Sequence, residues 1–345
     1  MPALYRYTAP VRKKAATGPV AAVYAQMSAD FLLGDGPLMA LSPAPDLLTA
    51  AWALLREAQV AGDASRAGRE LVAAVVSSGN ECPFCVDAHT LLVHATGAHA
   101  SAETVRSGGT PADPGHAALV AWATGTATAA TAATAATGSA APPFPAAEAP
   151  EYLGTVLVTH FINRMVSSLL TEELLPGGLQ GSALVRRVAG RVAGGNARRR
   201  SRPGESLPLL AGLPAAPPPS WAGDSPVGPA FAALRAVAAT GGDLLTDPAR
   251  TAVLDTVARW DGGPQPMASG WLDAPLAALP AADRPAARLA LLAALAPYRV
   301  TDADIAAWRT PHHRPDAELV RLLAFGAMAA VERVATWVGV RQPTP

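Results

Sequence analysis

The sequence is poor in charge and in aromatic side chains. Charged residues make up 16% of its 345 residues and aromatic residues 5%, while hydrophobic residues reach 50%. The formal net charge is zero, so the chain as a whole has no field that would attract nucleic acid or an acidic membrane surface. We therefore expect no nucleic-acid partner, and the hydrophobic fraction is large enough for a sizeable buried core.

A long uninterrupted apolar run is also absent. The most apolar stretch, residues 155–170, is shorter than a membrane span requires and contains His160, Asn163 and Arg164. Residues 1–30 show neither the apolar core nor the cleavage pattern of a signal peptide. We therefore predict a cytoplasmic protein that does not associate with a membrane.

Cysteine occurs only twice, and the two residues are close together. In a reducing compartment, a close cysteine pair is more typical of catalysis or metal binding than of a structural crosslink. Alanine, in contrast, is abundant, and a chain rich in Ala, Leu and Arg is typical of an all-α fold. The main helices are expected at residues 17–27, 45–61, 65–78, 82–95, 151–170 and 317–338.

Composition divides the chain into three parts. Residues 1–175 contain an N-terminal arm and a helical domain with both cysteines. Residues 176–230 are rich in Gly, Pro and Arg and are predicted to form an irregular linker. Residues 231–345 are predicted to form a second helical domain.

The two helical domains show a weak internal similarity. Residues 66–76 and 284–294 both form an amphipathic pattern that is followed by a break and a further helix. We interpret the second domain as a degenerate copy of the first, in which Val300 and Ala303 stand where the cysteines would fall. A fused pair of this kind would imitate a homodimer within one chain.

The segment Cys82-Pro83-Phe84-Cys85 carries the clearest chemical pattern in the chain. Two residues between the cysteines allow a short disulfide if Cys82 caps a helix and Cys85 lies in its first turn. Proline suits the first helical position, which supports this placement. The helix dipole then favours a thiolate at Cys85, the form of cysteine that attacks a peroxide or a disulfide.

Two further residues complete the candidate site. His89 follows Cys85 by four residues, so it lies one turn further along the same helix face and can exchange a proton with the sulfur. Glu70 lies on the preceding helix, and its carboxylate would orient His89 if the two helices pack together. This predicts a relay of thiol, imidazole and carboxylate.

Other interpretations of these residues are open. The cysteines could be small buried hydrophobes, or Cys82, Cys85 and His89 could bind zinc, although no fourth ligand completes a tetrahedron. His160 is either a core histidine with satisfied hydrogen bonds or part of a pocket together with Asn163 and Phe84. We predict no metal and no cofactor other than a redox-active Cys82–Cys85 disulfide.

The segment RELVAAVVSSGNECPFCVDAHT, residues 69–90, resembles the alkylhydroperoxidase D family within the carboxymuconolactone decarboxylase superfamily. The stretch HFINRM, residues 160–165, also resembles members of this superfamily, and the likeness covers roughly residues 45–170. The resemblance implies an all-α, AhpD-like helical domain, an oligomer built from the repeated helical unit, and a thiol-bearing protein as the reductant.

The resemblance also implies a role for each residue of the site. Cys85 would be the peroxidatic cysteine, Cys82 the resolving cysteine, and Glu70 with His89 the proton relay. The family has a histidine just before its second cysteine, where this chain has Phe84.

The sequence thus predicts a thiol-dependent peroxidase or disulfide oxidoreductase acting on a hydroperoxide or a disulfide. Two alternatives stay open. One is a non-catalytic or small-molecule-binding helical protein of the same fold. The other is a biosynthetic enzyme that uses the thiol pair on a specific substrate.

Overall fold

The protein is all-α, as its composition predicts. Within the part described by the computed structural model, the backbone pairs in an extended form only at two isolated bridges, and no strand is present. None of the described helices combines the length and the apolar character needed to cross a membrane. The described residues are 4–30, 36–132, 142–172, 174, 182, 185–188 and 201–338.

Among the described residues, seven longer helices of the first half build the domain that contains the cysteines. Ser65 caps the helix that precedes the cysteines, because its hydroxyl accepts a hydrogen bond from the Gly68 amide at 3.2 Å. The cysteine helix ends at Gly97, whose φ of 98° is typical of a glycine that terminates a helix. These helices are α1 (Gly18–Asp30), α2 (Pro45–Leu55), α3 (Arg66–Gly79), α4 (Pro83–Thr96), α5 (His99–Arg106), α6 (Pro114–Thr124) and α8 (Ala149–Leu169).

The helix expected over residues 45–61 changes its winding before it ends. It is α-helical as far as Leu55 and continues as one wide π-helical turn, η3 (Arg56–Val60), which is closed by a hydrogen bond from the Ala61 amide to the Arg56 carbonyl at 2.7 Å. Such turns often occur at functional sites, since the extra residue redirects the side chains around it. Here the turn is buried and carries Gln59 into the candidate site.

The second half is built in the same way from helices and short turns. Its longest helix ends the described part of the chain, as the apolar pattern over residues 317–338 predicts. The elements are α10 (Val227–Ala239), η8 (Thr240–Leu244), α11 (Asp247–Ala258), α12 (Gly270–Ala277), α13 (Arg284–Leu295), η9 (Pro297–Arg299), α14 (Asp302–Arg309) and α15 (Asp316–Val338).

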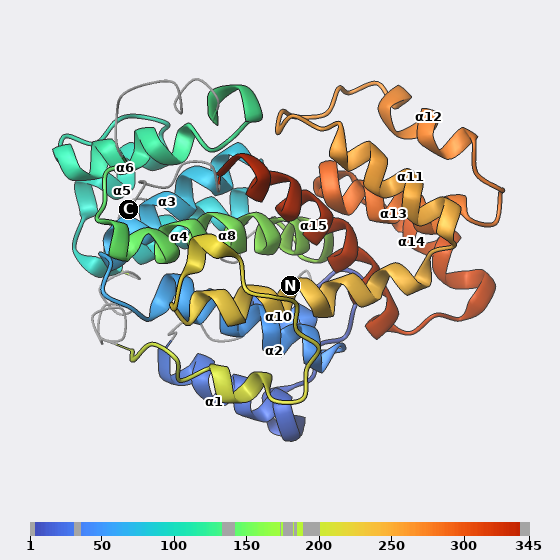
Figure 1. The fold of residues 1–345 in the computed structure, drawn as a ribbon, viewed down its shortest axis with the longest axis horizontal. Helices are drawn as coiled ribbons and strands as arrows, with labels where there is room; N and C mark the ends of the chain where they lie inside the picture. Colours follow the sequence, from blue (N-terminus) through green and yellow to red (C-terminus); the bar gives the residue numbers. More distant parts are fainter. Residues whose placement is uncertain are drawn as a thin grey trace.

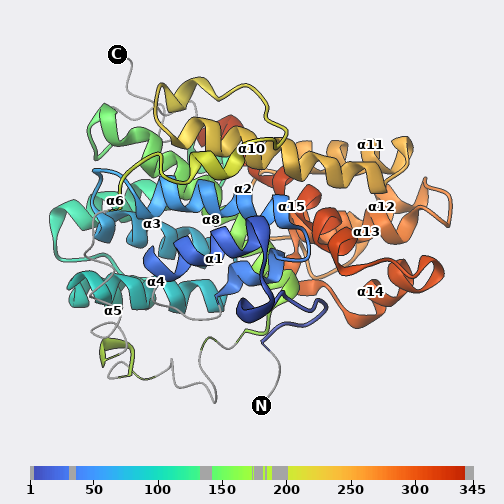
Figure 2. The same cartoon turned by 90° about the horizontal axis from the view of Figure 1, so that it is seen from below.

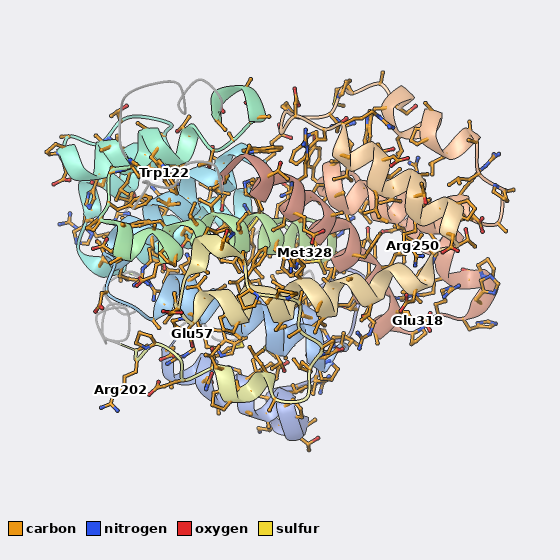
Figure 3. The ribbon with its side chains drawn as sticks, in the orientation of Figure 1. Glu57, Trp122, Arg202, Arg250, Glu318 and Met328 are labelled. Atoms are coloured by element: carbon orange, nitrogen blue, oxygen red, sulfur yellow. A yellow bond between two sulfur atoms is a disulfide. The ribbon has the colours of Figure 1, made fainter. Side chains whose placement is uncertain are left out.

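The two halves pack through matching helices. Helix α2 packs against α10, and α8 packs against α15, so the corresponding helices of each half meet at the centre of the molecule (Figures 1 and 2). One hydrophobic core runs through both halves, and Met328 of α15 lies within it (Figure 3). Pairing of equivalent elements is the arrangement of a two-fold symmetric dimer, here within one chain. The domain limits at residues 175 and 231 stay a prediction.

The helix pair that holds the cysteines has a counterpart in the second half. Helices α3 and α4 pack against each other and against α8. Helices α13 and α14 likewise pack against each other, and α13 packs against α15. Helix α4 is capped by Cys82 and α14 by Thr301. Counted from these caps, Thr301 and Asp304 stand in the places of Cys82 and Cys85, one residue later than the sequence comparison suggested.

The counterpart position carries an ion pair instead of a thiol. Asp304 accepts a hydrogen bond from the backbone amide of Thr301 at 3.0 Å and one from Nε of Arg288 at 2.6 Å. Arg288 lies at the same distance from the start of α13 as Glu70 does from the start of α3. The second half therefore retains the helix pair, but its residues at these positions form an ion pair and include no cysteine.

Candidate active site

The two cysteines lie at the start of α4, where the sequence pattern places them. Cys82 is the N-cap residue and Pro83 the first helical residue. A disulfide joins Cys82 to Cys85, and their Cα atoms are 5.3 Å apart. Both side chains are buried, with 1% and 3% of their surface exposed. Cys85 therefore lies in the first turn, where the positive end of the helix dipole stabilises a thiolate.

The turn before Cys82 is tightly constrained. Glu81 has a φ of 53°, in the left-handed region that non-glycine residues rarely adopt. The Cys82 amide donates back to the Ser77 carbonyl at 3.0 Å. These contacts connect the end of α3 directly to the first cysteine and fix its position at the helix start.

His89 and Glu70 are brought together by the packing of α3 against α4. Nδ1 of His89 lies 2.8 Å from Oε2 of Glu70. The other carboxylate oxygen of Glu70 accepts a hydrogen bond from Nε of Arg66 at 2.7 Å. Glu70 is fully buried, whereas 13% of the His89 side chain is exposed. The imidazole therefore lies between a buried carboxylate and an accessible space.

Glu70 is held in its ionised form by its neighbours. Burial alone would raise its pKa, but the Arg66 guanidinium and the hydrogen bond from His89 outweigh that effect and lower the pKa below its ordinary value. The carboxylate is therefore a hydrogen-bond acceptor at neutral pH. Because Nδ1 of His89 is bound to this carboxylate, Nδ1 is the protonated ring nitrogen and Nε2 carries the ring's lone pair.

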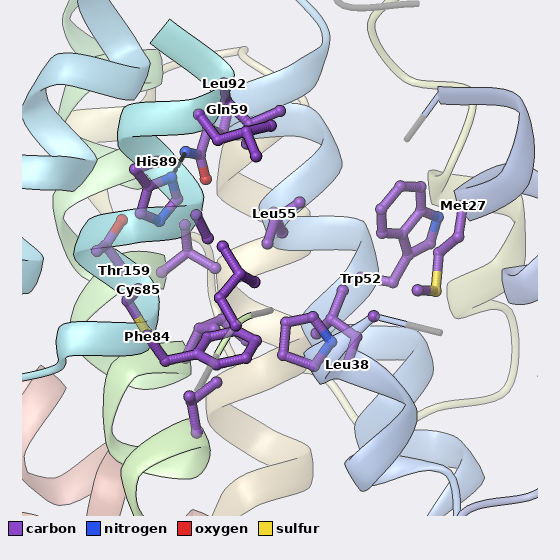
Figure 4. A pocket seen from close by; sticks show the side chains of 18 of the residues that line it. Met27, Leu38, Trp52, Leu55, Gln59, Phe84, Cys85, His89, Leu92 and Thr159 are labelled. Carbon is purple, nitrogen blue, oxygen red and sulfur yellow. Dashed lines mark hydrogen bonds between the residues drawn. The ribbon is translucent and has the colours of Figure 1, made fainter. Parts of the chain in front are cut away.

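A cavity of about 260 Å³ opens beside Cys85 and His89. Figure 4 shows both side chains on one wall. The Gln59 amide nitrogen lies 3.3 Å from Nδ1 of the imidazole. The remaining wall is mostly hydrocarbon, so a ligand in this space would need an apolar body. The other residues around it include Met27, Leu38, Trp52, Leu55, Phe84, Leu92, Thr159 and Ile162.

Cys82 lines a second cavity, of about 470 Å³, with a different character. This cavity, called the polar cavity below, is more polar than the first, and it includes Arg6 of the N-terminal arm and Tyr298 of the second half. Burial and a hydrogen bond with Glu81 raise the pKa of Tyr298 above its ordinary value. Phe84 and Val166 border both cavities. The disulfide therefore has an apolar side at Cys85 and a polar side at Cys82.

The three residues considered for a pocket are placed in three different surroundings. Phe84 lines the apolar cavity beside Cys85. His160 lines a separate cavity on the other face of α8. Asn163 is buried and exchanges hydrogen bonds with the Ser77 hydroxyl at 3.1 and 3.2 Å. Asn163 thus ties α8 to α3 beneath the cysteine turn.

Two residues of the site were not predicted from the sequence. Gln59 donates a hydrogen bond to Oε2 of Glu70 at 3.0 Å and lies 3.3 Å from Nδ1 of His89. Arg66 anchors the carboxylate from the other side. The spacing of Arg66 and Glu70, one helical turn apart, was a usable signal for an ion pair. The sequence gives no such signal for Gln59. A regular helix over residues 45–61 would direct its side chain differently from the π-helical turn that the structure contains.

Comparison with known proteins identifies a close relative over almost the whole chain. The chain is 43% identical over 335 residues to a Mycobacterium tuberculosis protein named alkyl hydroperoxide reductase, covering 96% of this chain and 94% of the relative. No family model matches the sequence. No solved structure matches it either. The identity extends through both halves and includes the cysteine segment within its span, and the chain therefore belongs to the alkylhydroperoxidase D-like family.

Proposed function

We propose that this protein is a thiol-dependent peroxidase that reduces apolar hydroperoxides through a Cys82–Cys85 redox cycle. The observation that carries the proposal is the shared cavity of Cys85 and His89, with His89 bound to a buried, ionised Glu70. The name of the M. tuberculosis relative, alkyl hydroperoxide reductase, supports the same reaction class. The mostly hydrocarbon wall of the cavity favours an organic hydroperoxide over hydrogen peroxide.

The oxidation step takes place at Cys85. Its thiolate attacks the outer oxygen of the hydroperoxide, the O–O bond breaks, and the sulfur becomes a sulfenic acid. Nε2 of His89 takes the proton that the Cys85 thiol releases and passes it to the departing alkoxide, which leaves as an alcohol. Glu70 holds the imidazole in the tautomer and orientation that this transfer requires.

The second step forms the disulfide present in the structure. The Cys82 thiol attacks the sulfenic sulfur of Cys85, the S–S bond forms, and water leaves. One hydroperoxide and two thiols thereby become one alcohol, one water and one disulfide. The cycle needs no cofactor besides the cysteine pair.

We infer that the reductant reaches the disulfide from the polar cavity. An external thiolate attacks Sγ of Cys82, which lines that cavity, and Cys85 departs as a thiolate at the start of α4. A second thiol of the reductant then releases Cys82. The departing sulfur is the one that the helix N-terminus stabilises, which makes this direction of attack the faster one. The reductant is a thiol-bearing protein in a reducing compartment such as the cytoplasm.

The proposal is tested by mixing the reduced protein with one equivalent of cumene hydroperoxide. Intact mass and free thiols are followed by rapid quench. We expect a loss of two hydrogens and of both thiols. The Cys82→Ser variant should accumulate a sulfenic acid that dimedone traps, and Cys85→Ser should not react.

Other outcomes would point to the alternatives. Oxidation no faster than that of free cysteine would contradict a peroxidase. Stoichiometric zinc in the purified, reduced protein would favour a metal site at the two cysteines and His89. Saturable binding of an apolar ligand with no thiol reaction would favour a binding protein of the same fold.

A further inference from the structure

A third cavity, of about 290 Å³, lies on the opposite face of α8 from the cysteine cavity. Its wall is formed by α3, α6 and the turn at Gly262 of the second half, with His160 reaching it from α8. Among the described residues that line it, none is acidic and none is basic apart from His160. Neither cysteine borders this space, so it is separate from the proposed peroxidase site.

Next to this cavity lies a buried arginine with no carboxylate partner. Arg164 is 4% exposed, and its Nε donates to the Ala294 carbonyl at 2.8 Å. Its Nη1 donates to the carbonyl of His160 at 2.9 Å, and its guanidinium lies 5.3 Å from the ring centre of Trp260. No described Asp or Glu lies within 4.0 Å of it. Burying a charge without a counter-ion is costly, so a compensating negative charge nearby would be favoured.

His160 connects this arginine to the cavity. Nη1 of Arg164 donates to Nδ1 of His160 at 3.1 Å, so Nδ1 is the acceptor nitrogen of the ring. Burial and the nearby Arg164 charge lower the pKa of His160 well below its ordinary value, so the ring is neutral and its proton is on Nε2. That Nε2 donor is buried and has no hydrogen-bond partner. Donation from Arg164 also makes Nε2 a stronger donor.

A second unsatisfied donor lines the same cavity. Asn80, in the turn that follows α3, has a buried Nδ2 with no hydrogen-bond partner. Buried donors in native proteins are almost always satisfied, so two in one cavity indicate an occupant that accepts hydrogen bonds from both. Water could accept these bonds but would not offset the charge of Arg164.

We propose that this cavity binds a small monovalent anion, of the carboxylate class, between Nε2 of His160 and Nδ2 of Asn80. The anion accepts a hydrogen bond from each donor and offsets the buried Arg164 charge through the His160 ring. The site adjoins Cys82 in sequence, since Asn80 precedes it by two residues, but it is independent of the peroxidase reaction.

The experiment uses acetate as the probe with the full-length, oxidised protein. Isothermal titration calorimetry with sodium acetate, in a buffer of bulky ions, should show saturable binding at one site. His160→Phe should weaken binding by about 10-fold or more, since a hydrogen bond to a charged group is lost. Asn80→Asp places a negative charge against the anion and should abolish binding. His312→Phe, a change of the same kind at an exposed histidine, should bind as the parent does.

Either of two binding results would overturn the proposal. One is the absence of saturable acetate binding to the parent protein. The other is equal affinity in the parent and in Asn80→Asp, a variant whose partly buried position makes misfolding a lesser concern. Thermal melting of each variant confirms folding. A crystal grown in bromide should show an anomalous peak at His160 Nε2, and ordered water alone in that place would also contradict an anion site.

Discussion

Nδ1 of His89 lies 2.8 Å from Oε2 of Glu70, although 19 residues separate the two in the chain. This contact joins two helices, α3 and α4, and places a buried carboxylate behind the imidazole that faces the cysteine cavity. It is the feature on which the proposed proton transfer depends.

Replacing Glu70 with Gln should slow oxidation of Cys85 by about 10- to 100-fold, because His89 loses the charge that orients and polarises it. The measurement is the second-order rate constant for thiol loss with cumene hydroperoxide. Glu318→Gln, at a partly exposed acid in the second half, is the matched control and should react as the parent does. An unchanged rate in Glu70→Gln would remove the carboxylate from the mechanism.

The same carboxylate should make stability depend on pH. The pKa of Glu70 in the folded protein lies below its ordinary value of 4.5, so its contribution is fully present above that value and is lost as pH falls through the folded pKa. The parent should exceed Glu70→Gln in free energy of unfolding by about 2 kcal/mol at pH 7. The difference should shrink below pH 4.5. Urea unfolding at pH 7 and pH 4 measures it, and a constant difference would contradict the shift.

Gln59 should contribute to the same relay. Gln59→Glu places a second carboxylate next to Glu70 and should slow Cys85 oxidation more than Gln59→Leu does, because like charges in a buried site oppose ionisation of both. In Gln59→Leu we expect the rate constant for Cys85 oxidation to fall by about 5-fold, which corresponds to the loss of roughly one hydrogen bond. Stopped-flow kinetics with both variants tests the order. Equal rates for the two would indicate a purely structural role.

The apolar cavity should determine which hydroperoxides react. Leu92→Trp adds bulk to the cavity wall and should slow the oxidation of Cys85 by cumene hydroperoxide by about 10-fold. Overfilling a packed space costs on the order of 1–3 kcal/mol. Hydrogen peroxide, which is small, should react at nearly the parent rate. Leu254→Trp, at an exposed position on α11, is the control. Equal slowing of both peroxides would mean that the cavity does not bind the substrate.

The polar cavity should affect only the reductive half of the cycle. Arg6→Gln removes a positive charge that lines it, so reduction by mercaptoethanesulfonate, which carries an extra negative charge, should slow by about 2- to 5-fold. Reduction by mercaptoethanol should change less, and the rate with hydroperoxide should not change. Each rate is measured separately by stopped flow. Slowing of the peroxide step instead would contradict access from the Cys82 side.

The sequence by itself determined the helical class, the main helix positions and the start of α4. These features depend on neighbouring residues: alanine propensity, the caps at Ser65 and Gly97, and proline following Cys82. The spacing of the two cysteines and of His89, one turn later, is likewise a property of neighbouring residues on one helix. They could therefore be predicted before any tertiary contact was known.

Only the tertiary structure decided what surrounds the sulfurs. The π-helical turn that directs Gln59, the apolar and polar sides of the disulfide, and the contribution of Tyr298 from the second half all arise from packing between distant segments. The same holds for His160, whose role depends on Arg164 and on a cavity completed by Gly262. Local propensity carries no information about which distant surfaces meet, because burial is decided by the whole fold.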